Sequence, residues 1–399
     1  MLWLSMLDNR PIIDRILESE LSDLAARDQL RSLEVPAGIN LSSNDYLGLA
    51  THPALRQAVL NAVARAERMG ATGSRLLSGH SREWEELEAE FAEFAGAEAA
   101  LCFSSGYAAN VGLLSGLLGR GDAVFSDALN HASLVDGIRL SGAERMIYAH
   151  CDLEALEVAL RTHTGKSCRK LIVTESVFSM DGDFAPLSGI TALAQHHGAA
   201  VVVDEAHALG VFGPEGRGRM AELGLEREAF AIVYPCGKAL ASAGGVVCGS
   251  ATLKQFLINR ARTFLFTTAL PPYFAAQIGG ALKLARAADA ERARLAAMAA
   301  QLRTSLSDAG FDTGASASQI IPILLGENAV ALHYAAELSR AGFAARAIRP
   351  PTVPTETARL RLSLTCTLSD GDVARLAQTL SSIRVHAAES LHANSASRS

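Results

Sequence analysis

Apolar runs that end abruptly in polar or charged residues recur along the middle of this chain. Residues 198–203 (Gly-Ala-Ala-Val-Val-Val) end in 204–207 (Asp-Glu-Ala-His), and 231–234 (Ala-Ile-Val-Tyr) end in 235–238 (Pro-Cys-Gly-Lys). β-Branched residues follow one another here without alternation, so each run predicts a strand covered on both faces of its sheet. Both runs place ionisable side chains at a strand end, which is where open α/β sheets bind their ligands.

Further apolar segments predict strands, with helices between them, near 99–103, 122–126, 144–149, 169–175 and 245–249. This alternation predicts an α/β fold with a mainly parallel sheet of about seven strands wrapped by helices. Polar clusters follow several of these strands, at 104–110, 130–133 and 174–183. Small residues open a helix after Ser105, and a helix start of this kind favours a phosphate.

The flanking segments carry helical periodicity. We expect a surface helix over 12–33, a helix over 52–68, a glycine-rich loop at 70–79 and one long helix from Pro272 to about Ala309. Strands near 319–325 and 359–364, with helices near 328–341 and 370–384, predict a smaller α/β C-terminal domain, and the polar last dozen residues should fray. The predicted organisation is an N-terminal helix and segment (1–50), a large domain (51–285) and a small domain (286–399).

Composition narrows the class of protein. The 399 residues are 49% hydrophobic and 6% aromatic with a net charge of −6, which indicates an ordinary globular chain and no nucleic-acid partner. No segment is long and apolar enough to span a membrane, and the opening residues 1–4 lack the basic leader of a signal peptide. The cysteines lie far apart without metal-ligand spacing, so we expect reduced thiols in a cytoplasmic protein: Cys102, Cys151, Cys168, Cys236, Cys248 and Cys366.

Asp204 needs a partner, either a cation or hydrogen-bond donors, because burial of an uncompensated carboxylate costs several kcal/mol. A plain buried ion pair with Lys238 is one interpretation. The sharper one is a pyridoxal phosphate site, in which Lys238 holds the cofactor as a Schiff base, Asp204 keeps the ring nitrogen protonated and His207 reaches the ring hydroxyl. A carboxylate about 4 Å from a pyridinium is worth roughly 4 kcal/mol at an effective dielectric of ~20, or about three pKa units. That would keep the ring cationic and able to accept electrons.

Two other interpretations of these residues are weak. Gly237-Lys238 is followed by Ala239 and lacks the upstream glycine of a P-loop, which disfavours nucleotide hydrolysis. Asp204 and His207 have no third ligand at metal spacing, so we predict no metal site.

Several motifs together resemble the α-oxoamine synthases, a family of fold type I pyridoxal phosphate enzymes that join an amino acid to an acyl thioester with loss of carbon dioxide. They are residues 44–48 (Asn-Asp-Tyr-Leu-Gly), 179–183 (Ser-Met-Asp-Gly-Asp), 204–207, 237–238 and 359–362 (Arg-Leu-Arg-Leu). The resemblance extends from about Leu21 to about residue 385. It implies the fold of a fold type I PLP-dependent transferase.

Within this family, residues 73–79 and 349–354 are most similar to the branch that joins L-alanine to a pimeloyl thioester in biotin synthesis. Glycine-using members, such as 5-aminolevulinate synthase and 2-amino-3-ketobutyrate CoA ligase, are the first alternative. A pyridoxal phosphate aminotransferase and a cofactor-free binding protein on the same scaffold are the others.

The resemblance also implies roles for individual residues. His131 stacks on the cofactor ring and could donate to the thioester carbonyl, Arg361 takes the amino-acid carboxylate, and Ser74 leaves room for the methyl group of alanine where glycine-using members have Thr. The catalytic set is Lys238, His131, Asp204 and His207. Further cofactor contacts are expected from Gly106, Tyr107, Ser179, Thr267 and Thr268, and further substrate contacts from Arg31 and Thr352. For His131, helix capping by a structural histidine is the alternative.

The resemblance further implies a homodimer with shared active sites, in which Thr267 and Thr268 reach the neighbour's phosphate. The acyl group is carried as a thioester either of coenzyme A or of an acyl carrier protein. The clear departure from the family is Pro235, where a Thr usually bonds the cofactor phosphate. We therefore expect weaker retention of the cofactor.

Overall fold

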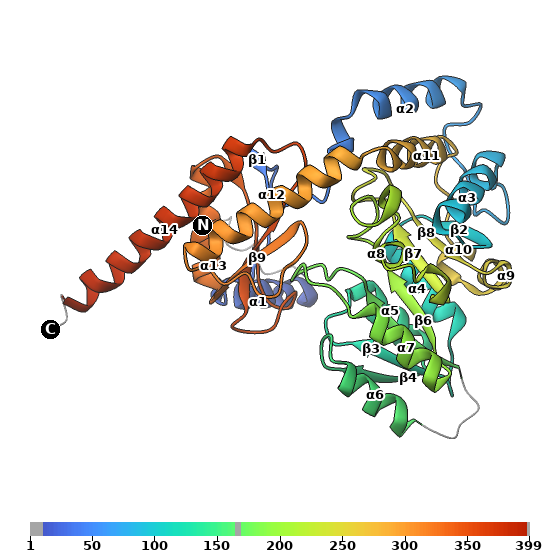
Figure 1. The fold of residues 1–399 in the computed structure, drawn as a ribbon, viewed down its shortest axis with the longest axis horizontal. Helices are drawn as coiled ribbons and strands as arrows, with labels where there is room; N and C mark the ends of the chain where they lie inside the picture. The colour runs from blue at the N-terminus through green and yellow to red at the C-terminus, as the bar shows by residue number, and fades with distance from the viewer. Residues whose placement is uncertain (1–10, 164–168, 397–399) are drawn as a thin grey trace.

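The computed structural model describes residues 11–163 and 169–396, and its centre is a seven-stranded sheet (Figure 1). The strand order is β2-β8-β7-β6-β5-β3-β4, and β8 runs antiparallel to both neighbours while the other pairs are parallel. The predicted mainly parallel sheet is thus confirmed. Its strands are β2 (Ala99–Phe103), β3 (Ala123–Asp127), β4 (Glu144–Tyr148), β5 (Lys170–Glu175), β6 (Ala200–Asp204), β7 (Ala231–Pro235) and β8 (Gly245–Gly249).

The central strands of the sheet are buried on both faces, as the unbroken apolar runs predict, whereas the edge strand β4 is largely exposed. In β6, Val201 and Val203 pack into one hydrophobic cluster and Val202 packs into the other, because successive side chains of a strand point to opposite faces. The first face is covered by α3 (Arg82–Ala95), α6 (Leu153–Thr162), α7 (Leu187–His197) and α11 (Tyr273–Arg286). The second is covered by α4 (Gly106–Leu117), α5 (Ala132–Ser141), α9 (Ala251–Arg260) and α10 (Arg262–Leu265).

A second, smaller body lies beyond α12 (Asp289–Asp308), which connects it to the sheet (Figure 1). Its antiparallel sheet has the order β11-β12-β9 and packs with α12 and the C-terminal helices in a separate hydrophobic cluster. The N-terminal segment joins this body through a parallel pair of short strands, β1 and β10. The elements are β1 (Ile39–Asn40), β9 (Ile320–Gly326), α13 (Asn328–Arg340), β10 (Phe343–Ala344), β11 (Ala347–Ile348), β12 (Ala358–Ser363) and α14 (Asp370–Ala396).

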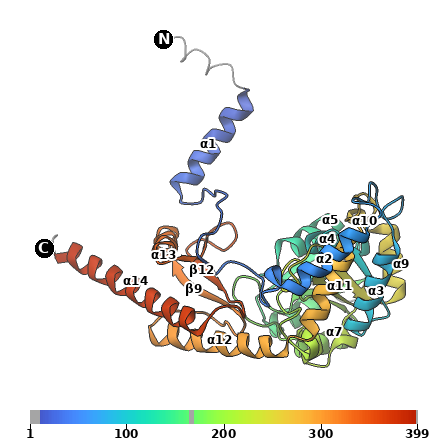
Figure 2. The ribbon, with the colours of Figure 1, turned by 90° about the horizontal axis from the view of Figure 1, so that it is seen from above.

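The remaining helices lie on the surface or in connections. Helix α1 (Ile12–Ala26) has no buried residue and projects away from the rest of the chain in Figure 2. Helix α2 (Pro53–Arg65) packs on α11. Short helices complete the list: α8 (Arg219–Glu222), η2 (Leu49–Thr51), η3 (Pro214–Gly216) and η4 (Glu226–Glu228).

Some predicted boundaries are wrong. The first helix ends at Ala26 instead of continuing to residue 33, and the predicted long helix to Ala309 is two helices, α11 and α12, separated at Ala287 and Ala288. Helix α14 continues to Ala396 instead of ending near residue 384. The two-residue strands β1, β10 and β11 and helix α3 were not predicted. The division into domains at residues 50 and 285 stays a prediction.

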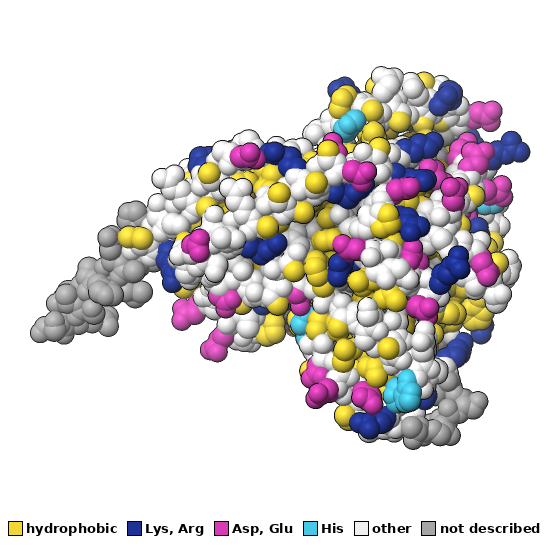
Figure 3. Space-filling model, viewed as in Figure 1, with side chains coloured by type: hydrophobic (Ala, Val, Ile, Leu, Met, Phe, Trp, Pro, Cys, Tyr) yellow, Lys and Arg dark blue, Asp and Glu magenta, His cyan; other side chains and the backbone are white. Residues whose placement is uncertain are grey.

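Acidic and basic side chains are interspersed on the face shown in Figure 3. Among the helices of the described residues, none combines the length and apolar character needed to cross a membrane. Five cysteines are described and all are free thiols, with Cys102, Cys236 and Cys248 fully buried. Cys168 and residues 1–4, on which two of our expectations depend, lie outside the described residues.

Candidate active site

A cavity of about 410 Å³ opens at the carboxyl edge of the large sheet. Strands β2, β3, β5, β6 and β7 all end at this edge, so the residues that follow them in the sequence meet around one space. The wall includes Gly106 after β2, His131 after β3, Glu175 at the end of β5, Asp204 at the end of β6 and Lys238 after β7. Four of these five residues were predicted to belong to the site.

Lys238 is a half-buried cation whose hydrogen-bond partner is a histidine. Its Nζ donates to Nε2 of His207 over 2.7 Å, and Nδ1 of His207 then donates to the Tyr46 hydroxyl over 2.5 Å. Burial lowers the pKa of Lys238 to about 8, against the opposing effect of the nearby Asp204 and Glu175 carboxylates. Burial and then the Lys238 charge hold the pKa of His207 well below its ordinary value, so this ring is neutral. The lysine is therefore able to give up its proton near neutral pH.

Asp204 is held by amide donors. Asn110 Nδ2 donates to Oδ2 over 2.7 Å, and the backbone N–H of Ala206 donates to Oδ1 over 2.8 Å. No cation among the described side chains forms a direct ion pair with this carboxylate, although its residue is only 3% exposed. A plain Asp204–Lys238 ion pair is thus not what the fold builds, and the carboxylate is available to a cationic group in the cavity.

Glu175 stands beside Asp204, because strand register pairs the two residues at the ends of β5 and β6. Its residue is 1% exposed and its Oε1 has no hydrogen-bond partner. Burial, with the neighbouring Asp204 carboxylate second, raises the pKa of Glu175 to about 8. The Glu175 carboxyl group is therefore largely protonated at neutral pH.

His131 both caps a helix and lines the cavity. Its Nδ1 accepts from the backbone N–H of Ser133 at the start of α5, so the proton of the neutral ring sits on Nε2. Burial lowers the pKa of His131 despite the opposing charge of Asp204. The capping alternative and the site role are thus compatible in one side chain.

Arg361, on β12, lies near this cavity as a buried guanidinium. Its Nε donates to the carbonyl oxygen of Ser179 over 2.5 Å, and its terminal nitrogens donate to Oδ1 of Asn44 over 3.1 and 3.2 Å. Asn44 itself lines the cavity. No carboxylate among the described side chains pairs with Arg361, which leaves its charge available to an incoming carboxylate.

The other predicted cofactor contacts differ in position. Gly106 starts helix α4 at the cavity wall, and a Cβ there would lie 2.5 Å from the Cβ of Pro235, so only glycine fits. Tyr107 lines the cavity but is 48% exposed, and its hydroxyl donates to Asp136. Ser179 is buried and faces Arg361 through its carbonyl group.

The predicted substrate contacts Arg31 and Thr352 lie together on the surface, although 321 positions separate them. The Arg31 guanidinium donates to the Thr352 hydroxyl over 3.1 Å. Arg349 donates to the backbone carbonyls of Asp28 and Leu30, which fixes the loop that carries Thr352 against the segment that carries Arg31.

Ser74, Thr267 and Thr268 do not line the cavity that holds Lys238. The loop with Ser74 and the segment with both threonines are neighbours, because the backbone N–H of Ala269 donates to the Gly73 carbonyl over 3.0 Å. Thr267 and Thr268 face a separate cavity of about 30 Å³.

Sequence analysis missed Glu175, Asn110 and Tyr46 as site residues. Glu175 and Asn110 belong to the polar clusters after β5 and β2, and Tyr46 belongs to the 44–48 motif, so each carried a signal. Their roles depend on strand register and on contacts such as Tyr46 with His207, which are 161 positions apart.

Comparison with known proteins identifies similar sequences and folds. Residues 36–380 match the family model described as aminotransferase class I and II. The 8-amino-7-oxononanoate synthase of Geobacter sulfurreducens is 44% identical over 384 residues, covering 92% of this chain and 98% of the relative.

Two solved structures are similar along most of the chain. One is a serine palmitoyltransferase variant from S. paucimobilis with a bound PLP–myriocin aldimine, with a TM-score of 0.86 and 30% identity, covering 94% of this chain and 98% of that one. The other is the 8-amino-7-oxononanoate synthase of Francisella tularensis, with a TM-score of 0.76 and 29% identity, covering 88% and 98%.

Proposed function

Because the chain belongs to the class I and II aminotransferase family and, within it, to the 8-amino-7-oxononanoate synthases, we propose that it condenses L-alanine with a pimeloyl thioester. The products are 8-amino-7-oxononanoate, carbon dioxide and a free thiol. The chain is an enzyme of the acyltransferase type, and its cofactor is pyridoxal 5′-phosphate. The observation that carries the proposal is the Lys238 ammonium group, whose pKa is lowered to about 8 and which faces a cavity that also holds Asp204.

The residues around the cavity fit this cofactor. Asp204 is a buried carboxylate without a paired cation, which suits a protonated pyridine nitrogen. Oδ1 of Asn110 and Oε1 of Glu175 are buried without hydrogen-bond partners, so the cavity presents unsatisfied polar atoms to a polar guest. The start of α4 at Gly106 offers free backbone N–H groups to a phosphate, and Lys238 is the amine to which the cofactor would attach.

Bound there, the cofactor supplies an electron sink for the negative charge that develops when a bond to the amino-acid α-carbon breaks. The protein supplies the proton transfer. Lys238 Nζ, with a pKa of about 8 and neutral His207 as acceptor, can take up a proton at neutral pH and return it later. Tyr46 fixes the tautomer of His207 by accepting from Nδ1, so Nε2 remains an acceptor toward Lys238.

The remaining residues orient the two substrates. Arg361 binds the carboxylate of alanine, because its charge is buried and has no carboxylate partner among the described side chains. His131 presents a neutral ring with its proton on Nε2, which allows donation to a thioester oxygen as charge develops there. Arg31 and Thr352, held together at the surface, contact the acyl substrate.

The active unit in this proposal is a homodimer with shared sites. Ser74, Thr267 and Thr268 lie on neighbouring segments away from the Lys238 cavity of their own subunit, which supports their use in the site of a second subunit. Sedimentation at decreasing concentration should show dissociation accompanied by loss of cofactor. A fully active monomer would refute the shared site.

The free thiols support a reducing cytoplasmic location.

The proposed reaction is tested by assays with both amino acids and both kinds of thiol carrier. Holoenzyme is incubated with L-alanine or glycine and with pimeloyl-CoA or a pimeloyl carrier protein, and the products are identified by mass spectrometry. We expect 8-amino-7-oxononanoate from alanine with at least one donor, and the donor that gives the higher kcat/KM identifies the carrier. A visible absorbance band removed by borohydride confirms the cofactor. Product from glycine alone would favour a glycine-using relative.

A further inference from the structure

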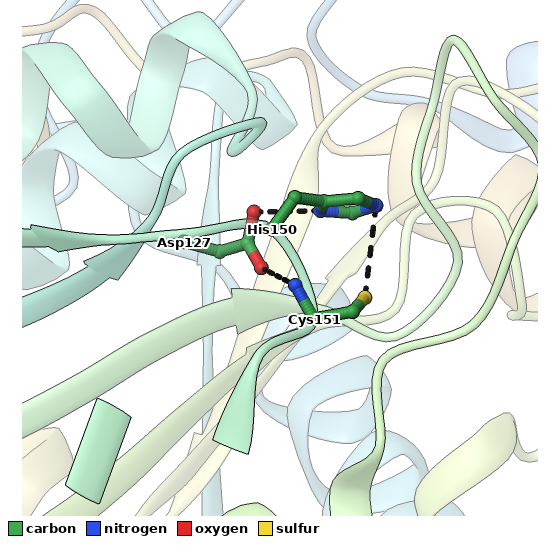
Figure 4. A group of neighbouring side chains, drawn as sticks. All are labelled: Asp127, His150 and Cys151. Atoms are coloured by element: carbon green, nitrogen blue, oxygen red, sulfur yellow. Dashed lines mark hydrogen bonds and ion pairs between the residues drawn. The ribbon is translucent and has the colours of Figure 1, made fainter. Parts of the chain in front are cut away.

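A second cluster of ionisable side chains lies at the same sheet edge but outside the cavity. His150, just after β4, sits between two carboxylates: Nδ1 lies 2.8 Å from Oδ1 of Asp127, and Nε2 lies 2.7 Å from Oδ2 of Asp183. Figure 4 shows the ring of His150 between Asp127 and the thiol of Cys151, whose Sγ is 3.6 Å from Nε2. The rings of His150 and Phe178 pack edge to face, with 4.3 Å between their centroids. None of these residues has a role in the proposed reaction.

One carboxylate of the cluster organises the segment that leads to His131. Asp127 ends β3, and it accepts from the backbone N–H groups of Leu129 and Cys151 over 2.8 and 2.9 Å. The segment continues through Asn130, whose side chain donates to the carbonyl of Val173 over 2.8 Å. The next residue is the cavity residue His131.

The other carboxylate closes the loop that carries Ser179. The backbone carbonyl of Asp183 accepts from Phe178 N–H over 3.0 Å, and Phe178 in turn accepts from Gly182 N–H over 2.9 Å. Between them stands Ser179, whose carbonyl oxygen accepts from Arg361. His150 is thus the point at which the 127–131 segment and the 178–183 loop are joined.

A metal ion is the competing explanation, because Asp127, His150 and Cys151 offer ligand atoms within 4.8 Å of one another. The charges argue against it. Burial alone would lower the pKa of His150, but the hydrogen bonds to Asp127 and Asp183 outweigh burial and raise it to about 12. Burial also raises the pKa of the Cys151 thiol. A metal would have to displace both protons, whereas an imidazolium already satisfies both carboxylates.

We propose that His150 is a positioning residue: as an imidazolium between Asp127 and Asp183, it holds the Ser179 loop against the His131 segment and thereby places Arg361 for the substrate carboxylate. The charged groups that face the ring are these two carboxylates, and the Cys151 thiol is the other titratable neighbour. The side-chain hydrogen bonds of Lys238, Asp204 and His207 do not involve the cluster, so loss of His150 should disturb substrate binding more than cofactor attachment.

The test compares wild type with His150→Gln, which keeps a polar side chain but cannot bridge two carboxylates as a cation. Hydrogen exchange of holoenzyme amides in 178–183 should become at least about tenfold faster, because local opening costs less free energy. The apparent Kd for L-alanine, read from the cofactor absorbance, and its KM should rise about tenfold, with a smaller change in kcat. The absorbance band and cofactor retention should be unchanged.

Two further variants separate positioning from general destabilisation. His333→Gln removes an exposed histidine that lies 4.0 Å from Glu337 on α13. It should change neither the hydrogen exchange in 178–183 nor the KM for L-alanine. Asp183→Asn keeps the shape and weakens one side of the bridge, so it should move both readouts in the same direction by less; it also keeps the proposal testable if His150→Gln fails to fold.

Several results would overturn the proposal. Unchanged exchange in 178–183 with unchanged alanine KM in folded His150→Gln would do so, as would equal changes in His333→Gln. Zinc alone, titrated into wild type, should not bind at one equivalent; binding lost in both His150→Gln and Cys151→Ser would make the cluster a metal site instead. The measurement of alanine binding rests on the proposed function, whereas hydrogen exchange in 178–183 does not. If wild type failed to bind alanine, the proposed function would be refuted. Hydrogen exchange alone would then decide whether His150 is a positioning residue.

Discussion

Two half-buried cations at one sheet edge have pKa values that move in opposite directions. Lys238 is lowered to about 8 and His150 is raised to about 12. Both lose hydration on burial, which by itself favours the neutral form of each. The difference lies in the hydrogen-bond partners: Lys238 donates to the neutral ring of His207, whereas His150 lies between two carboxylates.

In this fold, one cation is suited to proton transfer and the other to holding two segments together. A cation without a directly bonded carboxylate can exchange its proton near neutral pH, and Lys238 is placed where substrate must arrive. A cation bonded to two carboxylates keeps its proton at every physiological pH and can serve only as a fixed link. Variants that change one side and leave the other test this division of roles.

The largest effect is expected from removing the exchangeable cation. Lys238→Ala should still bind L-alanine in the presence of cofactor, because Arg361 and Asp204 are untouched, but turnover should fall by at least about 10³-fold without the proton acceptor. Spectral titration with alanine and steady-state assays measure the two properties. Lys283→Ala, at an exposed lysine on α11, is the control and should behave as wild type. Full turnover in Lys238→Ala would remove the lysine from the mechanism.

The choice between alanine and glycine is expected to depend on Ser74, which lies outside both clusters. Ser74→Thr should shift the preference from alanine toward glycine by about 10- to 200-fold in the ratio of kcat/KM values, since a methyl group in a tight pocket is worth about 1 to 3 kcal/mol. Ser74→Ala removes the hydroxyl without adding a methyl group and should keep the preference for alanine. Identical alanine-to-glycine ratios in all three proteins would show that residue 74 does not set the choice.

Sequence predicted the large sheet well because most of its strands are apolar runs followed by polar residues; the edge strand β4, which begins with Glu144 and Arg145, is the exception. The run 200–204 needs no partner to be recognised, since it is buried on both faces. Local pattern could not place the break at Ala287 and Ala288, because alanine favours helix and both flanking helices contain several alanines. The pairing of β1 with β10 was also invisible, since two residues carry no periodicity.

The candidate site was predicted as far as residue type and strand end allow. Asp204 and Lys238 stand out in the sequence because ionisable residues directly follow or soon follow strands. The neutral state of His207 could not be predicted, because it depends on Lys238 and on Tyr46, which belongs to a distant segment. The neighbour relation of Glu175 and Asp204 is a matter of register, which only the folded sheet fixes.

A smaller effect should come from Pro235, three residues before Lys238. Pro235 is buried against Gly106, at the helix start proposed to hold the cofactor phosphate, and offers it neither N–H nor hydroxyl. Pro235→Thr should slow cofactor loss on dialysis by about tenfold or more, because a hydrogen bond to a charged group is worth roughly 1.5 to 3 kcal/mol. Pro235→Val has the shape of Thr without the hydroxyl and should lose cofactor as wild type does. Equal rates for Thr and Val would contradict a hydroxyl effect.

The smallest effect is a pH dependence of stability from the fixed cation. The folded pKa of His150, about 12, lies above its unfolded value of about 6.5, so its stabilisation is fully present below pH ~6.5 and is lost as pH rises toward 12. The excess unfolding free energy of wild-type holoenzyme over His150→Gln should therefore decline from pH 6 to pH 9, by less than about 1.4 kcal/mol per pH unit because partial exposure screens the pairs. Urea unfolding measures it, and an excess that grows with pH would contradict the imidazolium.

The central claim is that this chain joins alanine to an acyl thioester with loss of the alanine carboxyl group. The direct measurement is a single-turnover experiment with carboxyl-labelled L-alanine, in which labelled carbon dioxide and free thiol are counted together. We predict that label is released only when pimeloyl thioester is present, in a one-to-one ratio with thiol. Label that remains in a keto acid, or that is released without thioester, would contradict the account and favour an aminotransferase or a simple decarboxylase.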